Sequence, residues 1–105
     1  MLGVWQIKER YMTIKLKKEF GEDFISRAAG ERLRKTIVAA NKKVIVDFEK
    51  QIVASVSFLD EAFAKLILEG WSEDQIEKTI TFKNIHSKDS ELIRKLIKDH
   101  IRETK

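Results

Sequence analysis

The sequence contains no cysteine and no proline. Without cysteine, the chain has no disulfide scaffold, no thiolate metal site and no thiol nucleophile. The lack of proline argues against a long rigid linker. No uncharged apolar run approaches the roughly 20 residues that a bilayer requires, and the first ten residues lack the long apolar stretch of a signal peptide. These absences predict a cytoplasmic globular protein without a membrane segment.

The 105 residues suffice for one domain, predicted to span 1–105. Hydrophobic residues make up 43% and charged residues 36%, which excludes a disordered chain. The net charge of +4 is mildly basic, but lysines and arginines are interleaved with acids. A nucleic-acid partner is therefore disfavoured, because dedicated binders concentrate basic residues on one face. It stays open as the alternative function, through Arg27, Arg32, Arg34 and Lys35.

The hydrophobic pattern predicts alternating strands and helices. Met12, Ile14 and Leu16 alternate with polar residues, which indicates a half-buried edge strand over 11–18. The β-branched run at 44–48 is typical of a buried strand, and 79–83 alternates again. Helical spacing predicts helices between these strands and a final one, at 27–41, 57–70, 71–78 and 92–101. The order predicts an α/β fold with a right-handed crossover and a parallel pair.

Helix boundaries follow from capping residues. Ser26 and Ser57 are predicted N-caps, and Ser72 with Gln75 has the capping-box spacing. Asn41 is expected to end the first helix. Gly30 within this helix costs about 1 kcal/mol relative to alanine, and it would allow a neighbour to approach closely. The segment 52–56 is a second β-like stretch without full pairing, and 84–89 a loop. Residues 1–10 are compatible with a strand or a helical turn.

The sequence offers no catalytic constellation. It has no glycine-rich phosphate loop and no G-x-S-x-G motif. His86 lies near Asp89 and Glu91, but a loop histidine beside solvated acids is a weak metal signal, so no metal is predicted. Asp47 ends a buried strand and is expected to accept loop N–H groups. A hydrolase using Asp47 and Ser57 would have no base. We therefore expect a protein that is not an enzyme and that has no cofactor.

The segment 44–68, VIVDFEKQIVASVSFLDEAFAKLIL, carries a family resemblance. Together with Ser26-Arg27-x-x-Gly30-x-x-Leu33 and the strand before Asn84, it resembles the STAS-like domain family of uncharacterised bacterial proteins. This family is distantly related to the anti-sigma-factor antagonists. The resemblance implies a small mixed β-sheet with helices packed mainly on one side. It also implies a regulatory protein-interaction module, with a partner such as a GHKL-type ATPase or kinase.

The antagonists carry a switch serine, typically within D-S-S-G, at the start of the helix after the central strand. In this chain Phe58 aligns with that phosphoacceptor and Ser57 with its acidic neighbour. The resemblance therefore implies a domain that lacks the usual acceptor. Ser57 is a candidate regulatory residue, although Asp60 and Glu61 would repel a phosphate there, and we favour a capping role.

The carboxyl ends of parallel strands and the adjoining helix N-termini share one edge of a sheet. We expect a partner surface at that edge, and no reaction centre. A homodimer also stays open, because Leu2, Val4, Trp5 and Ile7 are more apolar than a free terminus needs. The predicted partner-binding residues are Asp47, Glu49, Lys50, Ser55, Ser57, Asp60, Asn84 and His86.

Overall fold

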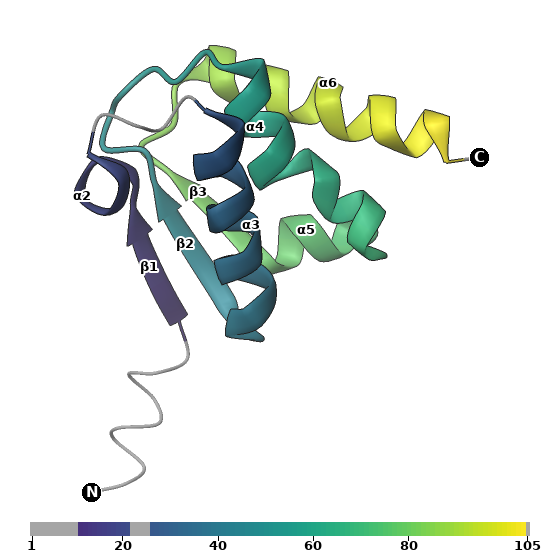
Figure 1. Cartoon of the computed structure of the whole chain (residues 1–105), viewed down its shortest axis with the longest axis horizontal. Coiled ribbons are helices and arrows are strands. Elements are labelled where there is room, and N and C mark those ends of the chain that lie inside the picture. The colour runs from purple at the N-terminus through teal and green to yellow at the C-terminus, as the bar shows by residue number, and fades with distance from the viewer. Residues whose placement is uncertain (1–10, 22–25, 105) are drawn as a thin grey trace, which may run out of the picture.

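The computed structural model describes residues 11–21 and 26–104, so the predictions for 1–10 lie outside the described residues. A three-stranded sheet forms the centre of the fold (Figure 1). Its strands pair in parallel, with Met12 opposite Val44 and Val44 opposite Ile80. The expected sheet was mixed, but every strand pair within the described residues is parallel. In sheet order the strands are β1 (Tyr11–Lys15), β2 (Lys43–Asp47) and β3 (Ile80–Lys83).

The described helices lie mainly on one side of this sheet (Figure 1). The strand side chains that point into the helix layer include four buried ones: Ile14, Val44, Val46 and Ile80. On the opposite face, Thr13, Ile45 and Thr81 are more exposed. Asp47 is buried as well, at the end of β2. The expected α/β class with helices on one side is confirmed. The described helices are α2 (Leu16–Phe20), α3 (Arg27–Ala40), α4 (Val56–Ala62), the 3₁₀ helix η1 (Ala64–Glu69), α5 (Glu73–Thr79) and α6 (Ser87–Glu103).

The predicted strand at 11–18 is too long, because the chain turns into α2 after Lys15. Leu16 is fully buried, as the alternation required, but it is the first residue of the helix. The Glu49 side chain accepts the backbone N–H of Lys17 at 2.9 Å. This carboxylate satisfies a first-turn donor that has no partner within the helix. A contact 32 residues away thus ends the strand.

Of two N-caps predicted from serine residues, the structure confirms one and moves the other by two residues. Ser26 Oγ accepts the N–H of Ala29 at 3.1 Å, which confirms the predicted start of α3. The predicted cap at Ser57 is wrong: Ser55 Oγ accepts the N–H of Phe58 at 3.2 Å, and α4 begins at Val56. The β-like segment at 52–56 forms no strand, because its residues lead directly into this helix.

The remaining boundaries follow the sequence with two changes. Asn41, at φ 51°, ends α3, and Ser72 caps α5 through the N–H of Gln75, both as predicted. The helix predicted at 57–70 is divided at Phe63, which separates α4 from η1. The loop predicted at 84–89 is shorter, because His86 Nδ1 accepts the N–H of Lys88 and starts α6.

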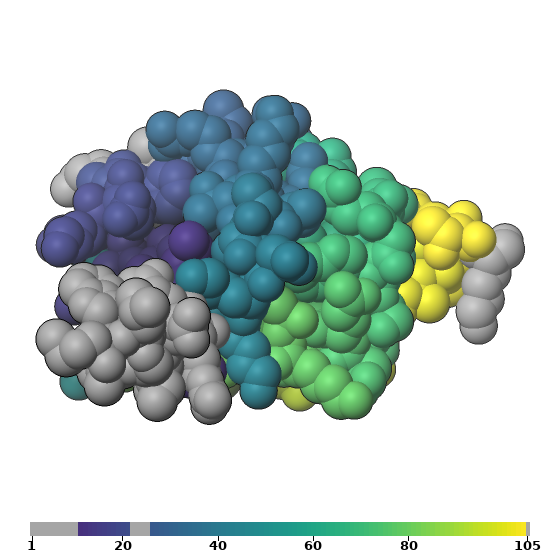
Figure 2. Space-filling view, turned by 90° about the horizontal axis from the view of Figure 1, so that it is seen from below, coloured from purple at the N-terminus to yellow at the C-terminus, as the bar shows by residue number. Residues whose placement is uncertain are grey.

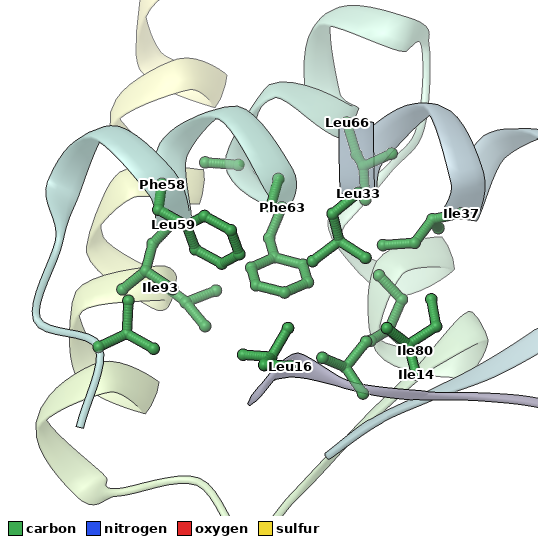
Figure 3. Close-up of a cluster of buried hydrophobic side chains, with 14 of the residues drawn as sticks. Ile14, Leu16, Leu33, Ile37, Phe58, Leu59, Phe63, Leu66, Ile80 and Ile93 are labelled. Atoms are coloured by element: carbon green, nitrogen blue, oxygen red, sulfur yellow. The ribbon is translucent and has the colours of Figure 1, made fainter. Parts of the chain in front are cut away.

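A single core lies between the sheet and the helices (Figure 3). Phe63 is at its centre, with its ring 5.0 Å from that of Phe82 on β3, nearly perpendicular to it, and 6.2 Å from that of Phe48. Phe58 is fully buried, as expected, and its ring lies edge-on to Phe20. Ile93 adds α6 to the same cluster. This core fixes where the loops at the strand ends begin.

Gly30 explains how α3 and α4 approach each other. A Cβ atom on Gly30 would lie 2.7 Å from the carbonyl oxygen of Phe58 and 2.8 Å from Cβ of Glu61. Both distances are shorter than normal van der Waals contact. The close helix approach that the sequence only suggested is therefore present, and it requires glycine here.

Replacing Gly30 with alanine is expected to destabilise the fold by about 1–3 kcal/mol, because the methyl group has no space. Helix propensity alone predicts the opposite, a gain of about 1 kcal/mol. Ala28 is exposed on the same helix, so Ala28→Gly is the matched control, with an expected loss of about 1 kcal/mol. Urea unfolding measures both variants. A stabilised Gly30→Ala variant would show that the helices have room to separate.

Candidate partner-binding rim

The carboxyl ends of β2 and β3 carry two loops that are bonded to each other. Asp47 Oδ1 accepts the N–H of Glu49 at 2.8 Å and the side-chain amide of Asn84 at 3.0 Å. The hydrogen bonds from Asn84 and from the Glu49 N–H hold the pKa of Asp47 below its usual value, against the effect of desolvation. Asp47 thus joins the loops as an acceptor, the role expected from the sequence.

Backbone contacts complete this edge. The N–H of Lys50 donates to the carbonyl of Asn84 at 3.2 Å, and the N–H of Phe48 donates to the carbonyl of Lys83 at 2.9 Å. We use the term rim for Asp47, the loop at 48–55, the first turn of α4 and residues 84–86. The Glu49 carboxylate accepts the N–H of Lys17, so this residue connects the rim to the start of α2.

The rim backbone adopts a conformation that is unusual for residues with side chains. Glu49, Lys50, Ala54 and Asn84 all have positive φ, between 49° and 64°. A left-handed residue other than glycine costs about 1–2 kcal/mol. Such a conformation persists only where surrounding contacts enforce it. The shape of the rim is therefore fixed by its hydrogen bonds.

Asp89 is the principal contact that enforces this shape. Its side chain is fully buried, and its two oxygens accept the N–H groups of Val53 and Ala54 at 2.7 and 2.8 Å. Sequence reasoning placed Asp89 in a loop and considered it only as a metal ligand. The one local signal was an acid in the first turn of a helix, where the dipole favours it. Its partners lie 36 and 35 residues away.

The fixed rim exposes apolar side chains. Ile52 and Val56 are 53% and 51% exposed and lie on either side of the segment held by Asp89. Lys50, Asn84 and His86 are exposed as well, and with Ile85 they line a hollow of about 290 Å³. Sequence reasoning missed Ile52 and Val56 as surface residues, because it read their segment as β-like.

The structure brings most of the predicted partner-binding residues together, but not all of them. Asp47, Glu49, Lys50, Asn84 and His86 come together on the rim, with Ser55 as the cap of α4 and Ser57 half-buried in its first turn. The placement of Asp60 on this surface is wrong. Its Oδ1 lies 2.7 Å from His100 Nε2, and its Oδ2 lies 3.7 Å from Arg27, so Asp60 faces α6 and α3.

A buried carboxylate links α3 to α4 beyond the rim. Glu61 is only 8% exposed, and its oxygens lie 2.9 Å from Arg27, 3.0 Å from Arg34 and 2.7 Å from Lys65. Desolvation raises its pKa, but the three bound cations outweigh that effect and lower it to about 2. The guanidinium of Arg32 lies over the Phe20 ring. Two of the four side chains of the nucleic-acid alternative are therefore engaged in internal ion pairs.

Two further observations concern the described part of the chain. No helix in it is both long enough and apolar enough to cross a bilayer. None of its histidine, aspartate and glutamate side chains form a group of three that could hold a metal ion. His86 and Asp89 do not converge, because each accepts a different backbone N–H group.

These features define a small α/β domain with a parallel sheet, one helical layer and a loop rim of fixed shape. The family model of the STAS-like domain of unknown function (DUF4325) matches residues 29–89. Since the match covers more than half of the 105 residues, the chain belongs to this STAS-like family. The match includes the whole rim. No curated protein and no solved structure matches the chain at a significant level.

Proposed function

We propose that this STAS-like domain is a regulatory protein-interaction module, not an enzyme, and that the rim is its docking surface. The observation that carries the proposal is the exposure of Ile52 and Val56 on a loop whose backbone is held by buried acceptors. An apolar surface presented in one conformation binds with less loss of conformational freedom than a flexible loop does.

The polar groups of the rim support binding more than catalysis. Asp47, Glu49 and Asp89 all accept hydrogen bonds from the chain itself. A general base needs a lone pair directed at the substrate. Asp89 uses both of its oxygens, and Asp47 and Glu49 use one oxygen each, to accept N–H groups of the chain. Lys50 and His86 line a hollow with Ile85 on the same rim, so the expected partner surface is an apolar surface with an acidic border. A GHKL-type ATPase or kinase is the partner class that the family resemblance favours.

The variant Ile52→Asp with Val56→Asp tests the docking surface. The matched control is Leu68→Asp, because Leu68 is 56% exposed on η1, outside the rim. The tagged full-length proteins are used to capture partners from host extract, and the captured protein is then purified and titrated. We expect the double variant to weaken binding at least about tenfold, and Leu68→Asp to change it less than about twofold.

Equal binding by the double variant and the wild type would overturn the docking surface. Circular dichroism and urea unfolding verify that both variants are folded. If the partner is a kinase, intact mass after incubation with ATP tests the regulatory role of Ser57. An unmodified chain is expected, since Asp60 and Glu61 are close in sequence and Phe58 occupies the acceptor position.

A further inference from the structure

The side of the sheet that faces away from the helices is a second candidate surface, which we call the open face. The described helices gather on the other side, where Figure 2 shows the teal atoms at the end of α3 beside the green atoms of α5. Strand side chains alternate between the two sides. The centre of the open face therefore consists of Thr13, Ile45 and Thr81, which lie opposite one another across the three strands. Thr13 and Thr81 are exposed, and Ile45 is half-buried.

The sequence of β2 does not match a sheet that is covered on one side only. Parallel sheets occur almost only where both faces are covered, and their strands then read as continuous apolar runs. Val44, Ile45 and Val46 form such a run, and Ile45 is the residue that faces away from the helices. The sequence of β2 is therefore typical of a strand with cover on both sides, which indicates that the open face receives cover from a partner.

The two ends of the open face are positively charged. Lys43 lies at its amino end, and Lys15 and Lys83 lie on either side of Asp47 at its carboxyl end. All three lysines are exposed, and none of them forms a salt bridge with a residue in 11–21 or 26–104. The Asp47 carboxylate is buried and accepts hydrogen bonds within the rim. An acidic partner would complement these cations.

We propose that the open face docks one helix of a partner protein, with an apolar stripe toward Ile45 and acidic residues toward the three lysines. Three strands span about 10 Å, which is about the diameter of one helix. The five residues of β1 or β2 extend over about 16 Å, which is the length of about three helical turns. This surface lies outside the rim except at Asp47, so the proposal is additional to the docking function of the rim.

Charge and shape select this occupant over two others. A second copy packed face to face would bring the lysines of one open face against those of the other, and like charges oppose association. A nucleic acid would also complement the lysines, but bases need aromatic side chains on which to stack. Among the described strand residues of this face, Tyr11 is the only aromatic one, and it lies at the margin.

Acetylation of lysines in the full chain, followed by mass spectrometry, tests whether the face is open. Lys88 and Lys98 are exposed on α6 and serve as references within the same molecule. In the free protein, Lys15, Lys43 and Lys83 should react as fast as these references. Protection of the three lysines in the free protein would show that another part of the chain or a second copy covers the face, and it would overturn the proposal.

A synthetic amphipathic peptide tests the occupant. The peptide has about 14 residues, or about four helical turns, with a leucine stripe, glutamates on both flanks, and alanine and glutamine on the far side. Fluorescence anisotropy should give a dissociation constant below about 100 μM, and replacing its glutamates with lysines should weaken binding at least about tenfold. Absence of binding, or equal binding of both peptides, would overturn the proposal. Tighter binding of a single-stranded oligonucleotide would assign the face to nucleic acid and overturn it as well.

Variants locate the bound peptide. Thr13→Glu with Thr81→Glu should weaken its binding at least about tenfold, because both charges lie at the centre of the open face. Ile52→Asp with Val56→Asp, on the rim, changes the net charge equally and should weaken binding less than about twofold. Equal losses, or a loss in the rim variant only, would overturn the open face and leave the rim proposal standing. In the wild type, the peptide should slow acetylation of Lys15, Lys43 and Lys83 but not of the references, which tests the location without any variant.

Discussion

Replacing Glu61 with alanine is expected to lower the free energy of unfolding by about 3–5 kcal/mol. Glu61 binds three cations, and Arg34 also donates to the Glu61 carbonyl. The Arg34 side chain is only 12% exposed, so removal of the carboxylate leaves a guanidinium that water solvates poorly. The same region holds the Gly30 contact between α3 and α4. Loss of Glu61 therefore weakens the tightest helix contact in the fold.

Glu31→Ala is the matched control for this prediction. Glu31 also contacts Arg34, at 4.0 Å, but half of its side chain is exposed. Its removal is expected to change stability by no more than about 0.5 kcal/mol. Urea unfolding at neutral pH measures both variants. If Glu61→Ala unfolds at the same urea concentration as Glu31→Ala, the Glu61 network does not contribute to stability.

The pH dependence of stability gives a second readout of the same network. The pKa of Glu61 is about 2 in the folded protein, against an ordinary value of 4.5. Because the folded pKa is the lower one, this contribution is fully present above pH 4.5 and is lost as the pH falls toward 2. The difference corresponds to about 3 kcal/mol. Glu61→Gln should flatten the loss of stability between these pH values, and an unchanged acid profile would contradict the assignment.

Replacing Asp89 with alanine should cost about 2–5 kcal/mol, because two N–H groups, on Val53 and Ala54, lose their acceptor. The left-handed conformation at Ala54 would also lose its main support. We therefore expect a local effect in addition to the global one. Amide hydrogen exchange at Val53 and Ala54 should accelerate more than exchange in β2.

Glu91→Ala is the control for Asp89, because Glu91 is an exposed acid on the same helix. It is expected to change stability by no more than about 0.5 kcal/mol. Wild-type exchange rates at Val53 and Ala54 in Asp89→Ala would show that another group holds the rim in its conformation.

Local patterns were sufficient where the determinants lie close together in sequence. Ser26 and Ser72 each cap a helix through an N–H three residues later, and Asn41 ends α3 in the left-handed conformation. The buried run of β2 was recognisable from its β-branched residues. Two serines two positions apart, Ser55 and Ser57, could not be distinguished by the same rule.

Determinants that lie far apart in sequence were not predictable. Glu49 ends β1 by capping α2 from 32 residues away, and Asp89 fixes the rim from 36 residues away. Asp60 is adjacent to the predicted surface in sequence, but its helical position turns it toward His100 and away from the rim. In each case a side chain serves a backbone or a partner that only the folded chain brings near.

These long-range contacts are the reason why we propose the rim as the docking surface. The rim combines a costly backbone with acceptors that enforce it, and it leaves Ile52 and Val56 in solvent.

The most direct test of the docking surface is amide hydrogen exchange of the full chain, alone and bound to the purified partner. Binding at the rim predicts slower exchange at 48–57 and 84–86, with β1 and the last turns of α6 unchanged. Protection confined to β1 or to the end of α6, with the rim amides exchanging as in the free protein, would contradict the account.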